Sequence, residues 1–209
     1  MKIFTFAGFT KHLKELDFDY VVLDKTFNDI TPQLIEKFRD KIIWNETNSN
    51  VRAVRIAKQL LKILEIAKGS VEHSSPHQDD DIFAIVDSDL IVPNLRNIDP
   101  QDKILSLCYW LYYPWANEIR PFCSGTTYIF RKNHIPIFEI ILNAYLDKQY
   151  YEEFPVDIFL HDHILHVNVL KLGTIHYVKT PEGEKKMEFT WKDINQVFKH
   201  IPEFVLIAW

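Results

Sequence analysis

Residues 82–94, IFAIVDSDLIVPN, place two carboxylates directly after an apolar run. Asp87 and Asp89 flank a single serine, and a second short apolar stretch follows them. Side chains at positions i and i+2 of an extended segment point the same way. The pattern therefore predicts a buried strand that ends with two acids facing one cation. The alternative is a strand that simply ends in a polar turn.

The chain around this stretch alternates between two patterns. Apolar or β-branched runs predict strands, and segments with three- and four-residue apolar spacing or helix-start signals predict helices. Strands are expected at residues 2–9, 19–25, 41–46 and 81–89, and helices at 11–16, 32–41 and 48–69. This alternation predicts a parallel sheet with crossover helices. Such sheets bind ligands at the carboxyl ends of their strands, where Asp87 and Asp89 are expected.

The long helix at 48–69 is expected to face the core with one stripe, formed by Val51, Val54, Ala57, Leu61 and Leu64. The acids at residues 79–81 are expected at the opposite end of the strand from Asp87. Strand residues rise about 3.3 Å each, so the two acid groups lie about 20 Å apart.

The second half of the chain follows a mixed pattern. Strands are expected at 103–113, 126–132 and 174–179, and helices at 135–148 and 156–173. The aromatic stretch 113–125 reads as a loop, and a charged loop and a helix follow residue 180. We expect an α/β fold with a mostly parallel central sheet flanked by helices and a smaller mixed second half, in one domain over residues 1–209.

Composition limits the class of protein. The chain has 209 residues, of which 47% are hydrophobic and 25% are charged, as in a soluble globular domain. A net charge of −5 argues against binding nucleic acid with the whole chain. No stretch is apolar for long enough to predict a transmembrane segment. Cys108 and Cys123 form neither a disulfide framework nor a zinc motif, so a reducing cytoplasm is the default and one disulfide is possible.

Three stretches resemble one enzyme family. IFAIVDSDLIVP looks like the Asp-x-Asp strand of nucleotide-sugar-dependent glycosyltransferases with the GT-A fold. NSNVRAVRIAK is similar to the helix that precedes that motif, and HDHILHVNVLKLGTIHYV is similar to the family's acidic helix, with matching positions at Asp162, Leu165, Asn168 and Gly173. His161 and Asn168 depart from the usual Glu and Arg. Compact glycosyltransferases of crenarchaeal viruses are similar in size and layout.

The resemblance implies a metal-dependent transfer of a sugar from a nucleoside diphosphate sugar to an acceptor hydroxyl on a glycan or protein. Asp87 and Asp89 would hold a divalent metal, Mn²⁺ or Mg²⁺, with Asp87 alternatively reaching the ribose. His176 would be a third ligand, although a lone histidine in a strand more often has no such role. A viral member would act in the host cytoplasm.

Asp162 is the expected catalytic base, with Asp157 as the alternative. If the base faces the leaving group from the opposite side, transfer inverts the anomeric centre. By the same resemblance, residues 1–95 would bind the nucleotide sugar, 96–180 would hold the acceptor and catalytic residues, and 181–209 would supply a mobile loop and a C-terminal helix.

The donor nucleotide is expected over the ends of the first two strands. Phe6, Ala7 and Gly8 would let the backbone approach the base, and Asp24 would accept a hydrogen bond or be a plain turn acid. Arg52 and Arg55 would bind the diphosphate or form a solvated basic stripe. Sugar stacking or packing is expected of the aromatic residues Tyr112, Tyr113 and Trp115.

Other functions fit parts of the same pattern. A haloacid-dehalogenase-like phosphatase would use the first acid of VDSD as a nucleophile, although that family places its motif on the first strand. A nucleotidyltransferase would also hold a metal with two carboxylates. A structural or interaction protein that retains a degenerate transferase fold is the non-enzyme alternative.

Overall fold

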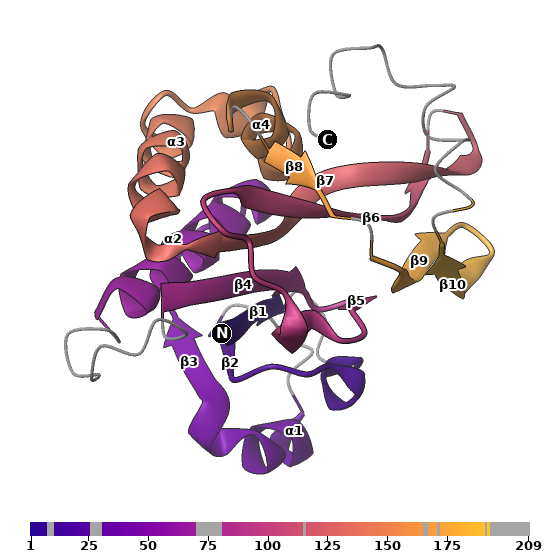
Figure 1. Ribbon diagram of the computed structural model, residues 1–209, viewed down its shortest axis with the longest axis horizontal. Helices are drawn as coiled ribbons and strands as arrows, with labels where there is room; N and C mark the ends of the chain where they lie inside the picture. Colours follow the sequence, from indigo (N-terminus) through magenta and orange to yellow (C-terminus); the bar gives the residue numbers. More distant parts are fainter. Residues whose placement is uncertain are drawn as a thin grey trace.

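A seven-stranded sheet lies at the centre of the fold, in the order β3–β2–β1–β4–β7–β6–β8 (Figure 1). The computed structural model describes residues 1–7, 11–25, 31–69, 81–114, 116–164, 167–170, 172–190 and 192. A three-stranded antiparallel sheet, β10–β9–β5, lies beside the larger one. The expected α/β architecture with a mostly parallel sheet is confirmed.

Four strands form the parallel half of the large sheet. They are β1 (Lys2–Ala7), β2 (Tyr20–Asp24), β3 (Ile42–Asn45) and β4 (Ile82–Asp87). β1 pairs with both β2 and β4 in parallel. The strand order therefore reverses direction between β1 and β4, which makes their carboxyl ends a topological switch point. Open α/β sheets bind ligands in the crevice at such a point.

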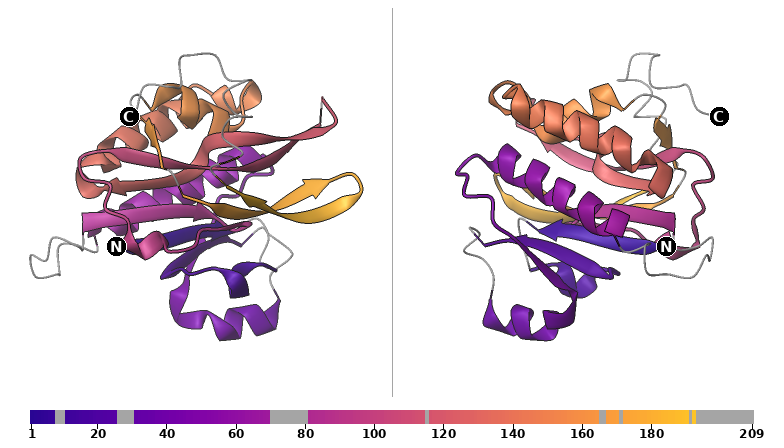
Figure 2. Two further views of the ribbon diagram at one scale, coloured as in Figure 1. Left: turned by 45° about the vertical axis from the view of Figure 1, so that its right-hand side comes forward. Right: turned by 90° about the vertical axis from the view of Figure 1, so that its left-hand side faces the viewer.

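Alternating side chains give the sheet two apolar faces. Phe4, Phe83 and Ile85 belong to the cluster beneath α2 (Arg52–Gly69), α3 (Ile135–Asp147) and α4 (Val156–His163). Their neighbours Ile3, Ala84 and Val86 point to the other face, where Leu13, Phe18 and Leu95 cover them. Figure 2 shows α2, α3 and α4 together on one side, with α1 (Pro32–Lys37) beyond the other. Because the period is two, Asp87 shares the face of Phe83 and Ile85.

The inward stripe of α2 differs from the expected one. Val51 precedes the helix and is 42% exposed, and Leu61 is only partly buried. The buried stripe is formed by Val54, Ala57, Gln59, Leu60, Ile63, Leu64 and Ala67. The helix begins four residues later than expected, at Arg52, and its packed face is wide enough to need both three- and four-residue steps.

β6 (Ile104–Tyr113) and β7 (Glu118–Arg131) form a long antiparallel hairpin. The expectation of a loop over 113–125 was wrong, because its residues from Glu118 onward pair with β6. Cys108 and Cys123 lie opposite each other in this hairpin and form a disulfide. β7 also runs antiparallel to β4, and so it brings residues 126–131 beside the Asp-x-Asp strand.

The predicted helix at 156–173 is also shorter than expected. α4 ends at His163, and β8 (Val167–Val169) pairs in parallel with β6. Two β-branched residues favour the pleated strand over a further helical turn. Of the register expected of one acidic helix, Asp162 lies in α4, Asn168 in β8 and Gly173 just before β9, while Leu165 lies outside the described residues.

The small sheet consists of β5 (Leu90–Ile91), β9 (Thr174–Thr180) and β10 (Gly183–Phe189). The charged loop expected after residue 180 falls on the turn and second strand of the β9–β10 hairpin, in which Gly183 adopts a φ of 122°. The predicted C-terminal helix and residues 204–209 lie outside the described residues. Within the described ranges, no helix is long and apolar enough to cross a membrane.

The β9–β10 hairpin is fastened to the segment that follows β1. The His12 ring stacks on Tyr177 with 3.7 Å between ring centroids, and its Nε2 lies 3.0 Å from Glu184. The Tyr177 hydroxyl donates to Glu15, which also pairs with Lys186 at 3.3 Å. These contacts set the position of β9 relative to the large sheet.

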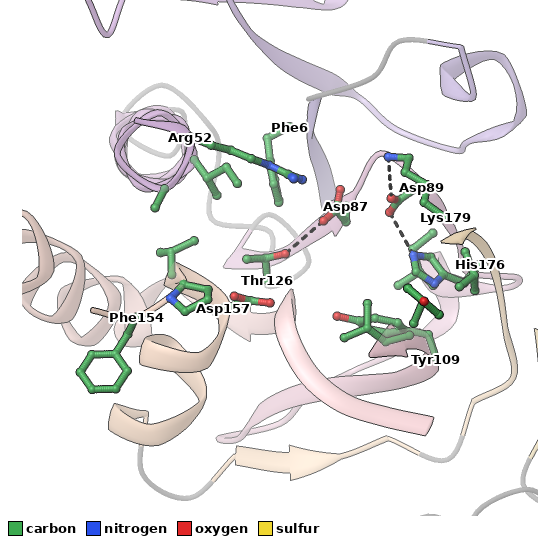
Figure 3. Close-up of a pocket in the computed structure, with 18 of the residues that line it drawn as sticks. Phe6, Arg52, Asp87, Asp89, Tyr109, Thr126, Phe154, Asp157, His176 and Lys179 are labelled. Carbon is green, nitrogen blue, oxygen red and sulfur yellow. Dashed lines mark hydrogen bonds and ion pairs between the residues drawn. The ribbon is translucent and has the colours of Figure 1, made fainter. Parts of the chain in front are cut away.

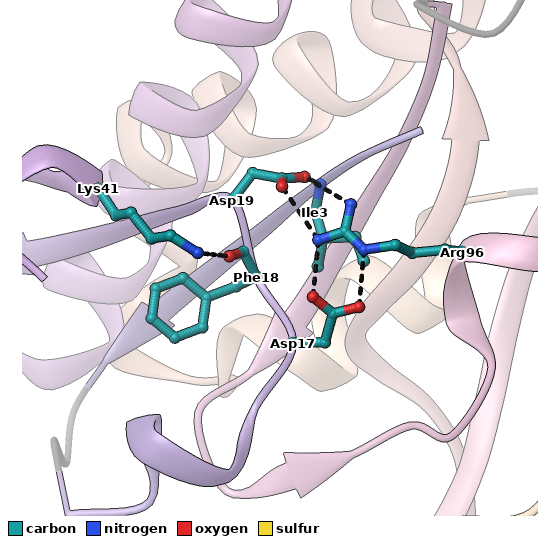
Figure 4. A network of polar contacts seen from close by, with 6 residues as sticks. All are labelled: Ile3, Asp17, Phe18, Asp19, Lys41 and Arg96. Carbon is teal, nitrogen blue, oxygen red and sulfur yellow. Dashed lines mark hydrogen bonds and ion pairs between the residues drawn. The ribbon is translucent and has the colours of Figure 1, made fainter.

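A polar network joins β1, β2 and the segment after β5 at the amino-terminal edge of the sheet (Figure 4). Arg96 donates two hydrogen bonds of 2.7 Å to Asp17 and bonds of 3.0 and 3.1 Å to Asp19. Asp19 also accepts a 2.8 Å bond from the backbone N–H of Ile3. Hydrogen bonds from Arg96 lower the pKa of Asp17, so this acid is held as a carboxylate beside the guanidinium.

Candidate active site

A pocket of about 620 Å³ opens at the carboxyl ends of β1 and β4, at the switch point of the sheet. Its lining includes Phe6, Asp87 and Asp89 on one side and residues 151–157 on the other. Figure 3 shows acidic, basic and aromatic side chains around this space, among them Asp87, Arg52 and Tyr109. The pocket therefore lies where the parallel sheet predicts a ligand.

Asp87 is the last residue of β4 and lies beside Phe6 of β1. Thr126 on β7 donates a 3.3 Å hydrogen bond to one carboxylate oxygen, and the backbone N–H of Ser88 donates a 2.7 Å bond to the other. Burial and then the charge of Asp89 raise the pKa of Asp87 to about 7. Asp87 thus carries an incompletely compensated charge that a bound cation would stabilise.

Asp89 lies in the turn after β4 rather than on the strand. Its carboxylate is 3.3 Å from Nε2 of His176 and 3.7 Å from Nζ of Lys179, and its backbone carbonyl accepts from Tyr177 N–H at 2.9 Å. Burial alone would raise the pKa of Asp89, but the hydrogen bond and charge of His176 outweigh it, and the pKa is lowered. Both acids line the pocket, yet they have different partners, because the strand ends between them.

His176 reaches Asp89 from β9 with a fixed orientation. Its Nδ1 donates to the Trp110 carbonyl, which leaves Nε2 directed at Asp89. Burial would lower the pKa of His176, but Asp89 more than offsets this effect and the pKa is raised. Metal binding by His176 stays a prediction.

The carboxylates are suited to a divalent cation without forming a complete site alone. Among the described residues, no three His, Cys, Asp or Glu side chains are grouped to hold a metal ion. Mg²⁺ commonly needs only one or two carboxylates, because substrate phosphates and water fill its other positions. Asp87, with its raised pKa, and Asp89 meet that lower requirement.

Two cations border the same space. Arg52, the first residue of α2, lines the pocket, and its charge partly offsets the raised pKa of Asp87. Lys179 lines the pocket beside Asp89. Arg55 instead donates to the backbone carbonyls of Ser49 and Asn50 at 3.1 and 3.3 Å and is not among the lining residues.

The two candidate bases occupy different surfaces of α4. Asp157, in the first turn of the helix, lines the pocket. Asp162 is exposed near the carboxyl end of the helix and is not among the lining residues. Five residues at about 100° each turn the two side chains roughly 140° apart. The geometry therefore places Asp157, and not Asp162, with Asp87 and Asp89; catalysis by either residue stays a prediction.

Tyr109 of β6 is a pocket residue that the sequence did not single out. Its ring packs edge-on against Phe122 and His176, with centroids 5.8 and 4.9 Å apart. Burial, followed by the charges of Asp157, Asp87 and Asp89, raises its pKa well above the ordinary value. A neutral hydroxyl is therefore held among three carboxylates. Lys179 and Thr126 were missed as well, because only strand pairing brings them to Asp89 and Asp87.

The remaining predicted donor residues divide between the pocket and other places. Phe6 is 2% exposed and lines the pocket, whereas Gly8 lies outside the described residues and Ala7 is described only as the end of β1. Asp24 is fully buried, accepts a 2.5 Å hydrogen bond from Thr47, and does not line the pocket.

Among the expected aromatic residues, Tyr112 lines the pocket and donates to Asn117 at 2.8 Å. Tyr113 is not among the lining residues, and Trp115 lies outside the described ones.

Comparison with known proteins finds a close viral relative. Uncharacterized protein 209 of Sulfolobus islandicus rod-shaped virus 1 is 63% identical over 207 residues, which cover 99% of this chain and 95% of the relative. No protein-family model matches the chain.

Solved structures with a similar outline include two transferases. A glycosyltransferase involved in the glycosylation of the major capsid of PBCV-1 is 13% identical, with 81% of this chain and 80% of that chain covered and a TM-score of 0.44. The CTP:phosphocholine cytidylyltransferase of Streptococcus pneumoniae is 12% identical, with 95% and 97% covered and a TM-score of 0.44. These likenesses concern the outline of the fold, and the residue roles proposed below rest on the pocket itself.

Proposed function

We propose that this chain, which belongs to the family of Uncharacterized protein 209 of the rod-shaped virus, is a metal-dependent glycosyltransferase. It would transfer a sugar from a nucleoside diphosphate sugar to an acceptor hydroxyl. One observation carries the proposal: the acid pair Asp87 and Asp89 lies at the switch point of the sheet, in a pocket that is also lined by Arg52, Lys179 and Asp157.

The donor diphosphate would lie against Asp87 and Asp89. A divalent cation there would neutralise charge on the leaving diphosphate through its phosphoryl oxygens. Arg52 and Lys179 would bind further phosphate oxygens, since both line the pocket beside the acid pair. His176 would orient Asp89, because its own ring is fixed by the Trp110 carbonyl. Asp87, with a pKa near 7, would lose its remaining proton when the positive charge arrives.

The acceptor hydroxyl would approach Asp157, which we propose as the base in place of Asp162. Asp157 lines the pocket from α4, whereas the acid pair lines it from the end of β4, and Asp157 would take the proton on the side away from the diphosphate. Transfer with this arrangement inverts the anomeric centre. Tyr109 would donate a hydrogen bond to a sugar hydroxyl, because its raised pKa keeps the phenol protonated.

The other functions require different behaviour from the same residues. A phosphatase of the haloacid-dehalogenase kind carries its aspartate nucleophile on the first strand, whereas Asp87 ends β4. A nucleotidyltransferase would use the acid pair in a similar way but would consume a nucleoside triphosphate and release pyrophosphate. A protein with no catalytic role would not need Asp157 to face the acid pair.

The test is calorimetric titration of nucleoside diphosphates and their sugars with and without Mn²⁺. We expect binding that needs the metal and is lost in Asp89→Asn. Asp157→Asn should keep donor binding and lose transfer by about 100-fold, whereas Asp162→Asn, a matched change on the same helix, should keep both. No binding to any of these nucleotides with metal present would refute the proposal. Pyrophosphate release from a nucleoside triphosphate and a sugar phosphate would replace it with the nucleotidyltransferase.

A further inference from the structure

One continuous segment forms the wall of the pocket opposite the acid pair. Residues 151–157 all line the pocket. The segment is held by its own hydrogen bonds: Glu152 N–H donates to Gln149 at 3.0 Å, and the Tyr145 hydroxyl donates to the Phe154 carbonyl at 2.6 Å. Gln149 adopts a left-handed conformation that turns the chain into this wall. The wall therefore has a fixed shape before any ligand arrives.

Large apolar side chains are exposed around this wall. Phe154 is 44% exposed, and Tyr150 and Ile158 are each 37% exposed. Figure 3 shows Phe154 directed outward at the rim of the pocket. Leu111 and Tyr112 of β6 also line the pocket. Exposed apolar side chains gathered beside a pocket are typical of an interaction surface.

The same wall is acidic. Residues 149–160, QYYEEFPVDIFL, contain three acids and no Lys or Arg. In the part of the chain that the structure describes, neither Glu152 nor Glu153 forms an ion pair, and both are exposed. The cations that line the pocket, Arg52 and Lys179, come from α2 and β9 instead. The pocket is thus basic where a phosphate is expected and acidic where the acceptor is expected.

We propose that residues 150–158, together with Leu111 and Tyr112, are the docking surface for a polypeptide acceptor. Its docked segment would present a serine or threonine hydroxyl between basic and apolar side chains. The inference rests on the proposed function, and it names the acceptor class for that site. Basic side chains would pair with Glu152 and Glu153, and apolar ones would pack on Phe154 and Ile158.

Charge and shape favour a polypeptide over other acceptors. A phosphorylated lipid or a nucleic acid would bring negative charge toward unpaired acids, which costs electrostatic free energy. A neutral glycan would stack on the aromatic rings and donate hydroxyl hydrogen bonds to the two glutamates, but it carries no charge to pair with them and would gain little from Ile158. A basic, apolar peptide segment uses the two glutamates, the aromatic rings and the exposed side chain of Ile158.

The test measures binding of short fluorescent peptides by anisotropy, with no donor present. One peptide has a central serine among lysines and leucines, and its match has glutamates in place of the lysines. We expect the basic peptide to bind about tenfold more tightly than the acidic one. The double variant Glu152→Lys and Glu153→Lys should abolish or reverse this preference. The control Glu36→Lys and Glu65→Lys makes the same change in net charge elsewhere on the exposed surface and should leave the preference intact.

Phe154→Ala should weaken binding of both peptides, because the apolar contact does not depend on charge. Equal affinity for the two peptides in the unmodified chain, or an unaltered preference in Glu152→Lys and Glu153→Lys, would overturn the docking surface. Displacement of the bound basic peptide by a neutral oligosaccharide would instead assign the wall to glycans and would also overturn the docking surface.

Nucleotide titration of the same proteins separates the two proposals. Metal-dependent nucleotide binding without peptide preference leaves the glycosyltransferase standing and removes the docking surface. Peptide preference without nucleotide binding does the reverse. Retained nucleotide binding in the charge variants also shows that they are folded, so a loss of peptide preference is due to the surface itself.

Discussion

Two Asp-x-Asp sequences lie at opposite edges of the same sheet, and the charges of their carboxylates are compensated to different degrees. Asp17 and Asp19 flank Phe18 before β2, and Asp87 and Asp89 flank Ser88 after β4. Arg96 donates to both members of the first pair. In the second pair, His176 and Lys179 lie beside Asp89, whereas Asp87 accepts from Thr126 and Ser88 and its pKa is raised to about 7. An identical spacing is thus built around one shared cation at one edge and leaves one carboxylate incompletely compensated at the other.

The pKa values express this difference. Hydrogen bonds from Arg96 lower the pKa of Asp17, so its ionised form stabilises the fold at neutral pH. Burial and the charge of Asp89 raise the pKa of Asp87 to about 7, so its ionised form destabilises the fold. The second pair retains an electrostatic cost that cation binding would relieve.

Replacing one carboxylate of each pair by an amide should give the largest difference in the rate of sugar transfer. We expect Asp89→Asn to lower sugar transfer by at least about 100-fold, because the leaving diphosphate loses part of its stabilisation. Asp19→Asn, the matched change at the other edge, should leave transfer within about twofold, since it lies away from the pocket. Initial rates at saturating metal provide the measurement, and similar losses in both variants would show that the two edges are not functionally distinct.

Removing Arg96, the cation of the first pair, should give the second-largest effect, which is on the stability of the fold. Arg96→Ala leaves Asp17 and Asp19 facing each other without their partner and should destabilise the fold by about 1–2 kcal/mol, a value reduced because the Arg96 side chain is 40% exposed. The melting temperature should then fall by roughly 2–8 °C in a scanning calorimeter. Metal-dependent nucleotide binding should be unchanged. A stable variant with damaged binding would mean that the network supports the site rather than the fold.

The smallest effect concerns Asp87 and depends on pH. A folded-state pKa of about 7, above the unfolded value of about 3.9, means that the folded state binds more protons between these limits. Stability associated with Asp87 is therefore fully present below about pH 4 and is lost as the pH rises toward 7. We expect Asp87→Asn to stabilise the protein by about 1 kcal/mol at pH 8 and by little at pH 4.

Thermal unfolding across that range tests the sign. Asp17→Asn should behave in the opposite way, with destabilisation at pH 8 that disappears in acid, because the pKa of Asp17 is lowered. A destabilised Asp87→Asn at pH 8 would show that its carboxylate is already compensated without a ligand.

Local pattern was sufficient for the strands of the parallel half of the fold, whereas its helices are shorter than expected. Strand and helix signals alternate there, and Asp87 lies at a strand end because Phe83 and Ile85 fix the period of the run. The spacing could not show that β4 ends between Asp87 and Asp89. It also could not reveal that Asp17 and Asp19 have a common partner, because Arg96 comes from far along the chain.

The mixed half depends on pairing between distant segments. Residues from Glu118 form a strand because they pair with β6, and β10 forms because it pairs with β9. Tyr109, Thr126 and Lys179 enter the pocket through those pairings. Asp157 replaces Asp162 as the proposed base for a different reason. Which side chains of α4 line the pocket depends on which face of the helix is packed, and the sequence alone does not show that face.

The pairing of β9 with β5 decides when the pocket can form during folding. Leu90 pairs with His176, so the turn that carries Asp89 meets its partners only after most of the chain has been synthesised. The nascent parallel half would therefore emerge from the ribosome with both acids but without His176 and Lys179. Long-range pairings form late, because loop closure must precede the contacts that reward it. Maturation of the proposed catalytic centre would then coincide with the completion of the fold, and a chain released early would have no working site.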